Sequence, residues 1–318
     1  MKKKFLSVLL VVIMSISVVG CSSNAKKETR PVPVPVKTLT IGVMPDLDSL
    51  PLIIASHNGY FKNEGLDVKL EHFKSASDRD AALQTGKING AISDMLSVVF
   101  FTDNKFDVKI TSKTEGSFKL ISGKSSNVTK IEQSAGKSIG ISKNTIIEYL
   151  TDRIMESSNI DVNSPKKVAI PKIPTRLEML TNGKLDMATL PEPLATTAVA
   201  AGGKVLSSSE KLGINPGVML FTGDAITSKP EEIKAFYRAY NKAVEYLKKE
   251  KPASYIDFVI KEAGFPATVK TTLTVPNYSV ASMSPEKELQ EVITWLKAKK
   301  LTTNSYTLKD LSNSSFIK

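Results

Sequence analysis

Residues 78–91 read DRDAALQTGKINGA, and residues 175–188, 97 positions later, read TRLEMLTNGKLDMA. In both stretches an arginine follows a capping residue, and a Gly-Lys pair separates a helical segment from a strand. Thr175 and Glu178 also have the spacing of a helix-capping box. This internal repeat predicts two lobes built on one α/β plan rather than one large sheet.

The segments around the repeat alternate between short β-branched runs and helical stretches, as α/β units do. The run Ile139–Ile141 echoes Ile41–Val43, which marks the start of the second copy. In the first lobe we expect strands at residues 39–43, 66–70, 88–92 and 108–111, and helices at 49–59, 77–86 and 95–101. Further helices are expected from Pro230 and from Pro285 in the C-terminal third.

Two apolar runs, residues 118–123 and 217–222, are associated with glycines and are typical of extended strands that cross between lobes. We therefore expect lobe 1 to comprise residues 38–120 together with 221–318, and lobe 2 to comprise residues 121–220. Bending at the two crossing runs would open and close a cleft between the lobes.

The composition excludes several classes of protein. The 318 residues include one cysteine, which excludes a disulfide framework and a thiolate metal cluster. The two histidines, His57 and His72, are too few for a multi-histidine metal site, and we expect each to be a surface or capping residue. The net charge of +11 is spread along the chain and is not interleaved with aromatic residues, which argues against a nucleic-acid partner and for a lysine-rich surface.

The first 37 residues predict export. Three lysines precede an apolar run at residues 5–19, which is shorter than the ~20 residues of a spanning helix. The run ends in VVGC at residues 18–21 and resembles a bacterial lipobox, so we expect a signal peptide at residues 1–20 and acylation of Cys21. Residues 21–37 are polar and then Pro-rich, as in a semi-rigid spacer. The expected location is the outer face of the cell membrane, through a lipid anchor.

Three further segments carry a family likeness. Residues 57–68, HNGYFKNEGLDV, resemble the GYF-x-x-EGL-x-V segment of substrate-binding proteins in the nitrate/sulfonate/taurine and thiamine-precursor group. Residues 82–89, ALQTGKIN, resemble the AL-x-x-G-x-I-D segment of that group, with Asn89 in place of Asp, and residues 190–195, LPEPLA, resemble a segment of its second lobe.

The resemblance covers about residues 38–250 and implies a type II periplasmic-binding-protein fold. Such a fold has two α/β lobes, two crossing strands and a ligand cleft between the lobes. The resemblance also implies that the protein delivers a solute to an ABC permease and its ATPase. We expect a monomer that is not an enzyme and that uses no cofactor or metal.

Ligands of open α/β sheets bind beyond the carboxyl ends of the strands, where helix N-termini point. The residues that follow each expected strand are therefore candidates for the cleft, although each of them could instead cap the next helix. We expect the ligand contacts to come from Asp46, Asp48, Ser49, Ser75, Ser93, Asp94, Glu115, Asn144, Thr145 and Glu192.

These loops are rich in carboxylates and hold only Lys74 and Lys143 as cations, unless Arg79 or Arg176 reaches in from the first turn of its helix. Because a buried carboxylate needs a cationic or hydrogen-bond-donating partner, we expect an amine or an aminopyrimidine-like ligand. A sulfonate, taurine or nitrate-type anion is the alternative, because residues 142–145 at a helix start could hold an oxyanion.

An enzyme of the same fold, resembling enzymes of an alternative menaquinone route, is a further alternative. The expected export argues against it, and so does the lack of a nucleophile–His–acid set in the sequence.

Overall fold

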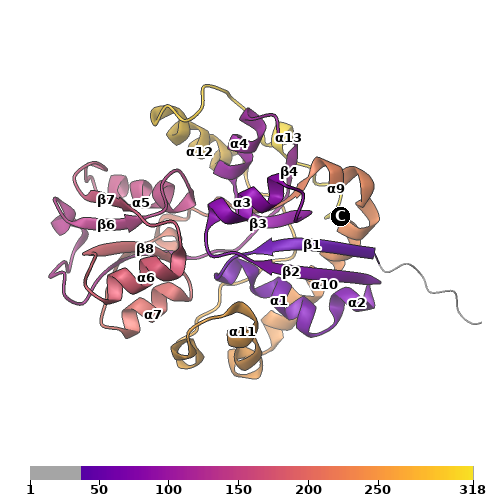
Figure 1. The fold of residues 1–318 in the computed structure, drawn as a ribbon, viewed down its shortest axis with the longest axis horizontal. Helices are drawn as coiled ribbons and strands as arrows, with labels where there is room; N and C mark the ends of the chain where they lie inside the picture. Colours follow the sequence, from indigo (N-terminus) through magenta and orange to yellow (C-terminus); the bar gives the residue numbers. More distant parts are fainter. Residues whose placement is uncertain (1–36, 318) are drawn as a thin grey trace, which may run out of the picture. The chain divides into compact units, whose positions relative to one another are not determined.

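The computed structural model describes residues 37–317, so the expected signal peptide, Cys21 and nearly all of the spacer lie outside the described residues. Two five-stranded sheets organise this part of the chain (Figure 1). The first sheet contains, in spatial order, β2 (Leu66–His72), β1 (Lys37–Val43), β3 (Gly90–Asp94), β10 (Gly217–Thr222) and β4 (Val108–Lys113). The second contains β7 (Lys166–Ala169), β6 (Ser138–Ile141), β8 (Met187–Pro191), β5 (Phe118–Ser122) and β9 (Lys204–Ser208).

The two sheets share one plan. In each, the first three strands in spatial order are parallel, and one strand that arrives from the other lobe pairs antiparallel with its neighbours. The arriving strands are β10 in the first sheet and β5 in the second. The expected two-lobed α/β class is therefore confirmed.

The crossing segments lie just before the two runs that were expected to cross. The apolar run at 118–123 forms β5 within the second sheet, and the run at 217–222 forms β10 within the first. The chain consequently passes between the sheets at residues 114–117 and 213–216. The sheet memberships divide the chain a few residues earlier than the expected boundaries at 120/121 and 220/221, because the apolar runs are buried members of the sheets and not linkers.

Lobe 1 has its core between the first sheet and a layer of helices. Helix α1 (Leu50–His57) packs against α10 (Pro230–Lys249), whose apolar stripe is buried as its spacing predicted. Gly59, at φ 72°, ends α1 and lets Phe61 of α2 (Tyr60–Asn63) reach the ring of Phe236 at 5.5 Å between centroids. The remaining helices are α3 (Ala76–Gln84), α4 (Met95–Asp103), α9 (Gly223–Ser228), α11 (Ile256–Ala263) and α13 (Leu308–Leu311).

Lobe 2 is built on α5 (Ile146–Ser157), α6 (Ile173–Thr181), α7 (Leu194–Ala200) and the short α8 (Ser209–Leu212). The prediction of a capping box at Thr175 is wrong, because α6 begins at Ile173 with Pro174 in its first turn. Proline is favoured in the first turn, where its missing N–H costs nothing, so the helix starts ahead of Thr175. Helix α3 likewise begins earlier than expected, at Ala76, with Ser75 as its cap.

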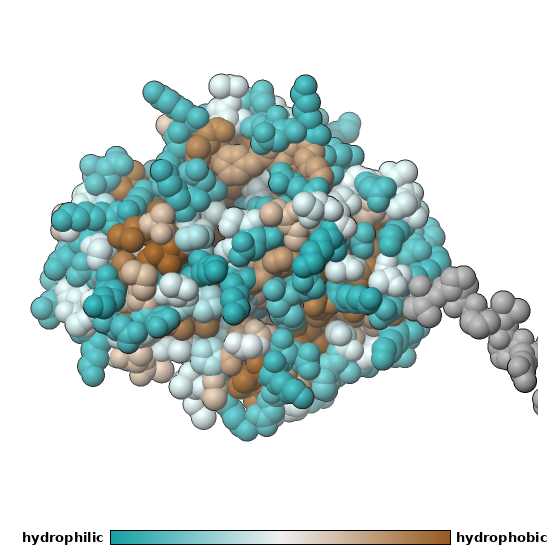
Figure 2. Space-filling view, in the orientation of Figure 1, coloured by the Kyte–Doolittle hydropathy of each residue, from teal (hydrophilic) through white to brown (hydrophobic). Residues whose placement is uncertain are grey.

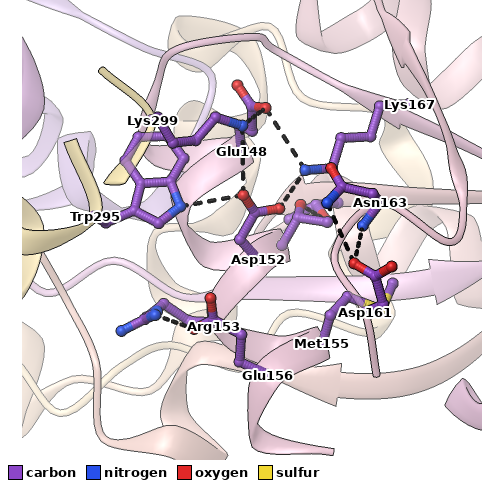
Figure 3. A network of polar contacts seen from close by, with 12 residues as sticks. Glu148, Asp152, Arg153, Met155, Glu156, Asp161, Asn163, Lys167, Trp295 and Lys299 are labelled. Atoms are coloured by element: carbon purple, nitrogen blue, oxygen red, sulfur yellow. Dashed lines mark hydrogen bonds and ion pairs between the residues drawn. The ribbon is translucent and has the colours of Figure 1, made fainter. Parts of the chain in front are cut away.

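Helix α12 (Glu286–Ala298) touches both lobes, since it packs on α4 of lobe 1 and on α5 of lobe 2. The indole N–H of Trp295 donates to Asp152 at 3.1 Å, and Lys299 pairs with both Glu148 and Asp152 (Figure 3). Lys167 pairs with the same two carboxylates from the other side. Both acids are almost fully buried, and both are paired with cations, so this network fastens α12 to α5.

Hydrophilic residues cover most of the surface that Figure 2 shows. The face in Figure 2 is largely hydrophilic, with apolar colour in small separate areas. Within residues 37–317, every helix is too short or too polar to cross a membrane.

Candidate functional site

The carboxyl ends of strands from both sheets border one cavity. Lobe 1 contributes the loop after β1 and the end of β3, and lobe 2 contributes the N-terminus of α5, the first turn of α6 and the end of β8. The volume of the cavity is about 40 Å³, which is room for about three water molecules. Its apolar lining comes mainly from Met44, Phe118, Ile146, Ile147, Pro171 and Ile173.

Backbone hydrogen bonds join the two lobes across the cleft. The N–H of Leu47 in lobe 1 donates to the carbonyl of Glu192 in lobe 2 at 3.0 Å. In the opposite direction, the N–H of Ile173 in lobe 2 donates to the carbonyl of Lys74 in lobe 1 at 2.9 Å. Because these two hydrogen bonds join the lobes directly across the cleft, in addition to the contacts of α12, the structure is that of a closed cleft.

The lobe 1 wall of the cavity is acidic. Asp46 is 6% exposed and accepts hydrogen bonds from the backbone N–H and the hydroxyl of Ser49. Burial raises the pKa of Asp46 from 3.8 to about 6, although these hydrogen bonds oppose the shift. Asp48 is 4% exposed, and burial together with the charge of Asp46 raises its pKa well above 3.8.

Asp48 is confined by the crossing segments and yet keeps a free oxygen. A Cβ at Gly116 would collide with its carboxylate, and a Cβ at Gly217 would lie 3.2 Å from its Oδ1. Among the described residues, Oδ1 of Asp48 has no hydrogen-bond partner. A buried carboxylate oxygen without a partner is costly, so this site is built to receive a donor.

Arg79 also lines the lobe 1 wall, but its charge is neutralised within the protein. Its guanidinium donates to Asp80 at 2.8 Å, to Ser97 at 3.1 Å and to the carbonyl of Ile92 at 3.2 Å, and it lies 3.9 Å from Asp94. Burial opposes the charge on Arg79, but the carboxylates of Asp80 and Asp94 outweigh burial and raise its pKa.

Arg176 in lobe 2 is fully buried and has no such compensation. It donates to the carbonyl of Thr189 at 2.9 Å and to the carbonyl of Ile170 at 2.7 Å. Its third nitrogen, NH2, has no partner within residues 37–317, and no carboxylate there pairs with it. Desolvation by burial lowers the pKa of Arg176 from 12.5 to about 9, which still leaves it charged at neutral pH.

The internal repeat explains the contrast between the two arginines. Arg79 and Arg176 occupy equivalent positions, and each donates to the carbonyl of the equivalent strand residue, Ile92 in β3 and Thr189 in β8. The polar partners of Arg79 are not repeated in lobe 2. At the positions equivalent to Asp80, Asp94 and Ser97, the second copy has Leu177, Pro191 and Leu194.

Four of the other residues expected at the ligand also lie at or near the cavity wall. Ser93 lines the cavity, and its hydroxyl has no hydrogen-bond partner in the described part of the chain. Asp94 lines it while capping α4 through the N–H of Ser97 at 2.9 Å. Thr145 lines it while capping α5, and Asn144 next to it donates its N–H to Glu148 at 2.7 Å.

Four more expected residues have their side chains engaged in the protein. Ser49 bonds to the backbone of Met44 and to Asp46, and Ser75 caps α3 through the N–H of Asp78. The other two carboxylates are paired with lysines outside the cavity wall, Glu115 with Lys113 and Glu192 with Lys119. These contacts are the capping and pairing roles that the sequence left open for each position.

From the sequence, Arg79 and Arg176 were expected in the site only if they reached in from the first turn of their helices. Each helix begins three residues before its arginine, and both arginines line the cavity. The apolar lining from Phe118, Ile147 and Ile173 was not anticipated, because only the polar residues of the loops were considered.

The two histidines lie away from this cavity. His57 ends α1 and stacks on Phe258, with the ring planes 3° apart. His72 ends β2, and burial lowers its pKa although Glu262 lies nearby.

The model of the NMT1/THI5-like family matches residues 46–253, and the chain belongs to this family. A putative ABC transporter periplasmic binding protein of Brachyspira hyodysenteriae is 24% identical over 66% of this chain and 65% of its own length, which is just under two thirds of that relative. A putative aliphatic sulfonates-binding protein of Bacillus subtilis is 24% identical over 99% of this chain and 96% of its own length.

Solved structures share the fold. The periplasmic aliphatic sulphonate binding protein SsuA of Escherichia coli superposes with a TM-score of 0.72 at 14% identity, over 87% of this chain and 92% of its own. The desulfurization enzyme DSZB superposes with a TM-score of 0.62 at 13% identity, over 88% of this chain and 97% of its own. The expected type II periplasmic-binding-protein fold is confirmed, and the same fold occurs in a protein named as an enzyme.

Proposed function

We propose that the chain is an extracytoplasmic solute-binding protein that captures a small organic solute and delivers it to an ABC permease and its ATPase. The observation that carries the proposal is the cavity, which both lobes line and whose lining includes Asp48, Ser93 and Arg176, each with one buried side-chain atom that has no partner among the described residues. The names of the relatives agree with this function.

Closure of the two lobes is the proposed mechanism of capture. In the closed cleft, both lobes line the cavity and backbone hydrogen bonds join the lobes across it. The solute therefore enters when the lobes part at residues 114–117 and 213–216. A ligand shifts this equilibrium only by its differential affinity for the closed state, and ~1.4 kcal/mol changes the closed-to-open ratio tenfold.

The favoured ligand is an amine or an aminopyrimidine-like molecule, because Asp46 and Asp48 form an acidic wall and Asp48 keeps an unpartnered oxygen. An anion of the sulfonate, taurine or nitrate type is the second candidate, and the unpaired NH2 of Arg176 favours it. Calorimetric titration of amines, aminopyrimidines, taurine, ethanesulfonate and nitrate tests both. Tight binding of ethanesulfonate or nitrate, with no heat from any amine or pyrimidine, would refute the amine proposal.

We propose that the protein is not an enzyme and that it acts as a monomer. The described lining of the cavity contains neither histidine nor cysteine, so it lacks the usual general base and thiol nucleophile. The fold alone does not decide this point, since DSZB shares it. Conversion of any bound solute, followed by mass spectrometry over hours, would contradict the proposal.

The anchor is a separate proposal. We propose that Cys21 is acylated after removal of residues 1–20 and that residues 21–37 space the body from the membrane. Substitution Cys21→Ser should move the protein from the membrane fraction to the medium or periplasm. Retention of the substituted protein in washed membranes would refute the lipid anchor and leave solute binding untouched.

A further inference from the structure

The two walls of the cavity include groups of opposite kinds, the Asp48 carboxyl and the Arg176 guanidinium, and each keeps one atom without a hydrogen-bond partner in the described part of the chain. We propose that the solute is dipolar, with a cationic or N–H-donating end bound by Asp48 of lobe 1 and an anionic carboxylate, sulfonate or phosphate end bound by Arg176 of lobe 2. This inference rests on the proposed function and narrows its class of solute.

The lobe 2 end of the site is built for an anion. Arg176 lines the cavity, its fully buried guanidinium is fixed by two backbone carbonyls, and its Nη2 has no hydrogen-bond partner among the described residues. Thr145, Ile146 and Ile147, at the N-terminus of the twelve-residue helix α5, line the same wall. A helix N-terminus adds partial positive charge and favours an anion beside the arginine.

The lobe 1 end of the site is built for a donor. Asp48 lines the cavity, its Oδ1 has no hydrogen-bond partner within residues 37–317, and the charge of Asp46 contributes to its raised pKa. Arg79 does not complete this wall, because Asp80 and Asp94 already take its charge. The Thr114 hydroxyl lowers the pKa of Asp48 but does not outweigh burial, so a ligand ammonium or amino group would add a further donor to this carboxyl.

Asp48 and Arg176 do not pair with each other in the closed cleft of the described structure. The lobes are already in contact through Leu47–Glu192 and Ile173–Lys74, yet Asp48 and Arg176 form no ion pair with each other in the described structure. A molecule that reaches from one wall to the other would pair both groups at once. Such a molecule would favour the closed state over the open one, because only the closed state brings both groups within its reach.

Matched solutes separate the two ends experimentally. The chain from residue 22 onward contains the complete compact unit of residues 36–318. After this protein is unfolded, washed and refolded, it is titrated with two sets: taurine, ethanesulfonate and ethylamine, and 4-aminobutyrate, butyrate and butylamine. We expect a dipolar member to bind at least about 30-fold more tightly than both single-ended partners of its set, because each buried charge pair is worth at least ~2 kcal/mol.

Two variants test which residue binds which end of the solute. In Arg176→Met, the preference for the dipolar solute over its matched amine should disappear, and in Asp48→Asn the preference over its matched anion should disappear. The matched control is Lys184→Met, an exposed lysine in the turn between α6 and β8, which should leave both preferences unchanged. A single-ended solute that binds as tightly as its dipolar partner would overturn the inference, and so would unchanged preferences in both variants.

A second measurement separates this inference from the proposed function. The refolded protein is equilibrated with the fraction of a host extract below about 1 kDa, and native mass spectrometry identifies what it retains. A retained solute with both an amino and an acidic group supports the inference. A retained solute with only one of them overturns the inference but leaves the proposed function standing. Retention of nothing, together with no binding in either titration set, would overturn the proposed function itself.

Discussion

Substituting each of the two equivalent arginines by methionine should have unequal consequences for the stability of the ligand-free protein, with a large loss at Arg79 and little change at Arg176. Methionine keeps much of the length of the arginine side chain and removes its charge. Arg79 loses its charge beside carboxylates that need it, whereas Arg176 loses a charge that nothing in the described structure balances. The comparison is well matched because the two residues occupy equivalent positions in the repeat.

The magnitude for Arg176 follows from two opposing effects. Desolvation lowers its pKa from 12.5 to about 9, which corresponds to a penalty on the order of 5 kcal/mol for keeping the charge buried. Methionine removes that penalty but also removes the hydrogen bonds to Ile170 and Thr189, each worth ~1.5–3 kcal/mol when the donor is charged. The net change in the free energy of unfolding should lie within ~2 kcal/mol of zero.

Arg79→Met removes no comparable desolvation penalty, because Asp80 and Asp94 outweigh burial and raise the pKa of Arg79. Methionine would leave Asp94, which is 1% exposed, without its cation. Removal of one partner of a buried ion pair costs ~3–5 kcal/mol. Arg79→Met should therefore be clearly less stable than Arg176→Met.

Urea unfolding of the refolded, ligand-free chain, followed by circular dichroism, measures both values. Equal slopes of free energy against urea would show that the variants unfold the same amount of surface. If Arg176→Met were destabilised as much as Arg79→Met, Arg176 would be a structural residue, and the idea that its charge is held in reserve for a ligand would be wrong.

Three further predictions follow from the same contacts. The raised pKa of Asp46 means that the folded state binds this proton more tightly than the unfolded state does. The contribution of this proton to the free energy of unfolding is complete below about pH 3.8 and is lost as the pH rises through about 6. Asp46→Asn should remove this decline in urea titrations at several pH values, and an unchanged decline would contradict the assignment. Cysteines substituted for Lys74 and Ile173, in a body that otherwise has no cysteine, should form a disulfide that fixes the closed cleft. X-ray scattering should then give a smaller radius of gyration for the oxidised form than for the reduced form. Failure of the pair to oxidise would argue against this contact between the lobes. Asp152→Ala should lower the free energy of unfolding by ~3 kcal/mol. It should also change the fluorescence of the single tryptophan, Trp295, whose indole donates to Asp152. An unaltered emission spectrum would mean that the indole does not depend on this carboxylate.

Much of the fold could be predicted from the repeat, because hydrophobic alternation and glycine stops are local properties of the chain. The exact starts of α3 and α6 could not, since Ser75 and Pro174 compete with later capping candidates and the winner depends on packing. The crossing runs were misplaced for a related reason. An apolar strand that leads out of a crossing has the same composition as a crossing strand, and only pairing in the sheet distinguishes them.

The site was predicted in part. Loops that follow parallel strands must meet at one edge of a sheet, so Asp46, Asp48, Ser93 and Asp94 were correctly placed near one another by topology alone. The unpaired state of Arg176 was not predicted, although the sequence contains the pattern that indicates it. Extending the repeat beyond residue 91 would have shown that the partners of Arg79 are absent from the second copy, and that the second arginine is therefore unpaired.

This asymmetry has a consequence for how the two lobes cooperate. If both copies kept an internally neutralised arginine, the cavity would be acidic throughout, and a cation could bind to lobe 1 without involving lobe 2. Replacement of the acidic and polar partners by Leu177, Pro191 and Leu194 leaves a positive group on one wall only. A solute that pairs with it and with Asp48 gains its second contact only when the cleft closes, so the difference between the two copies of the repeat itself couples recognition to closure.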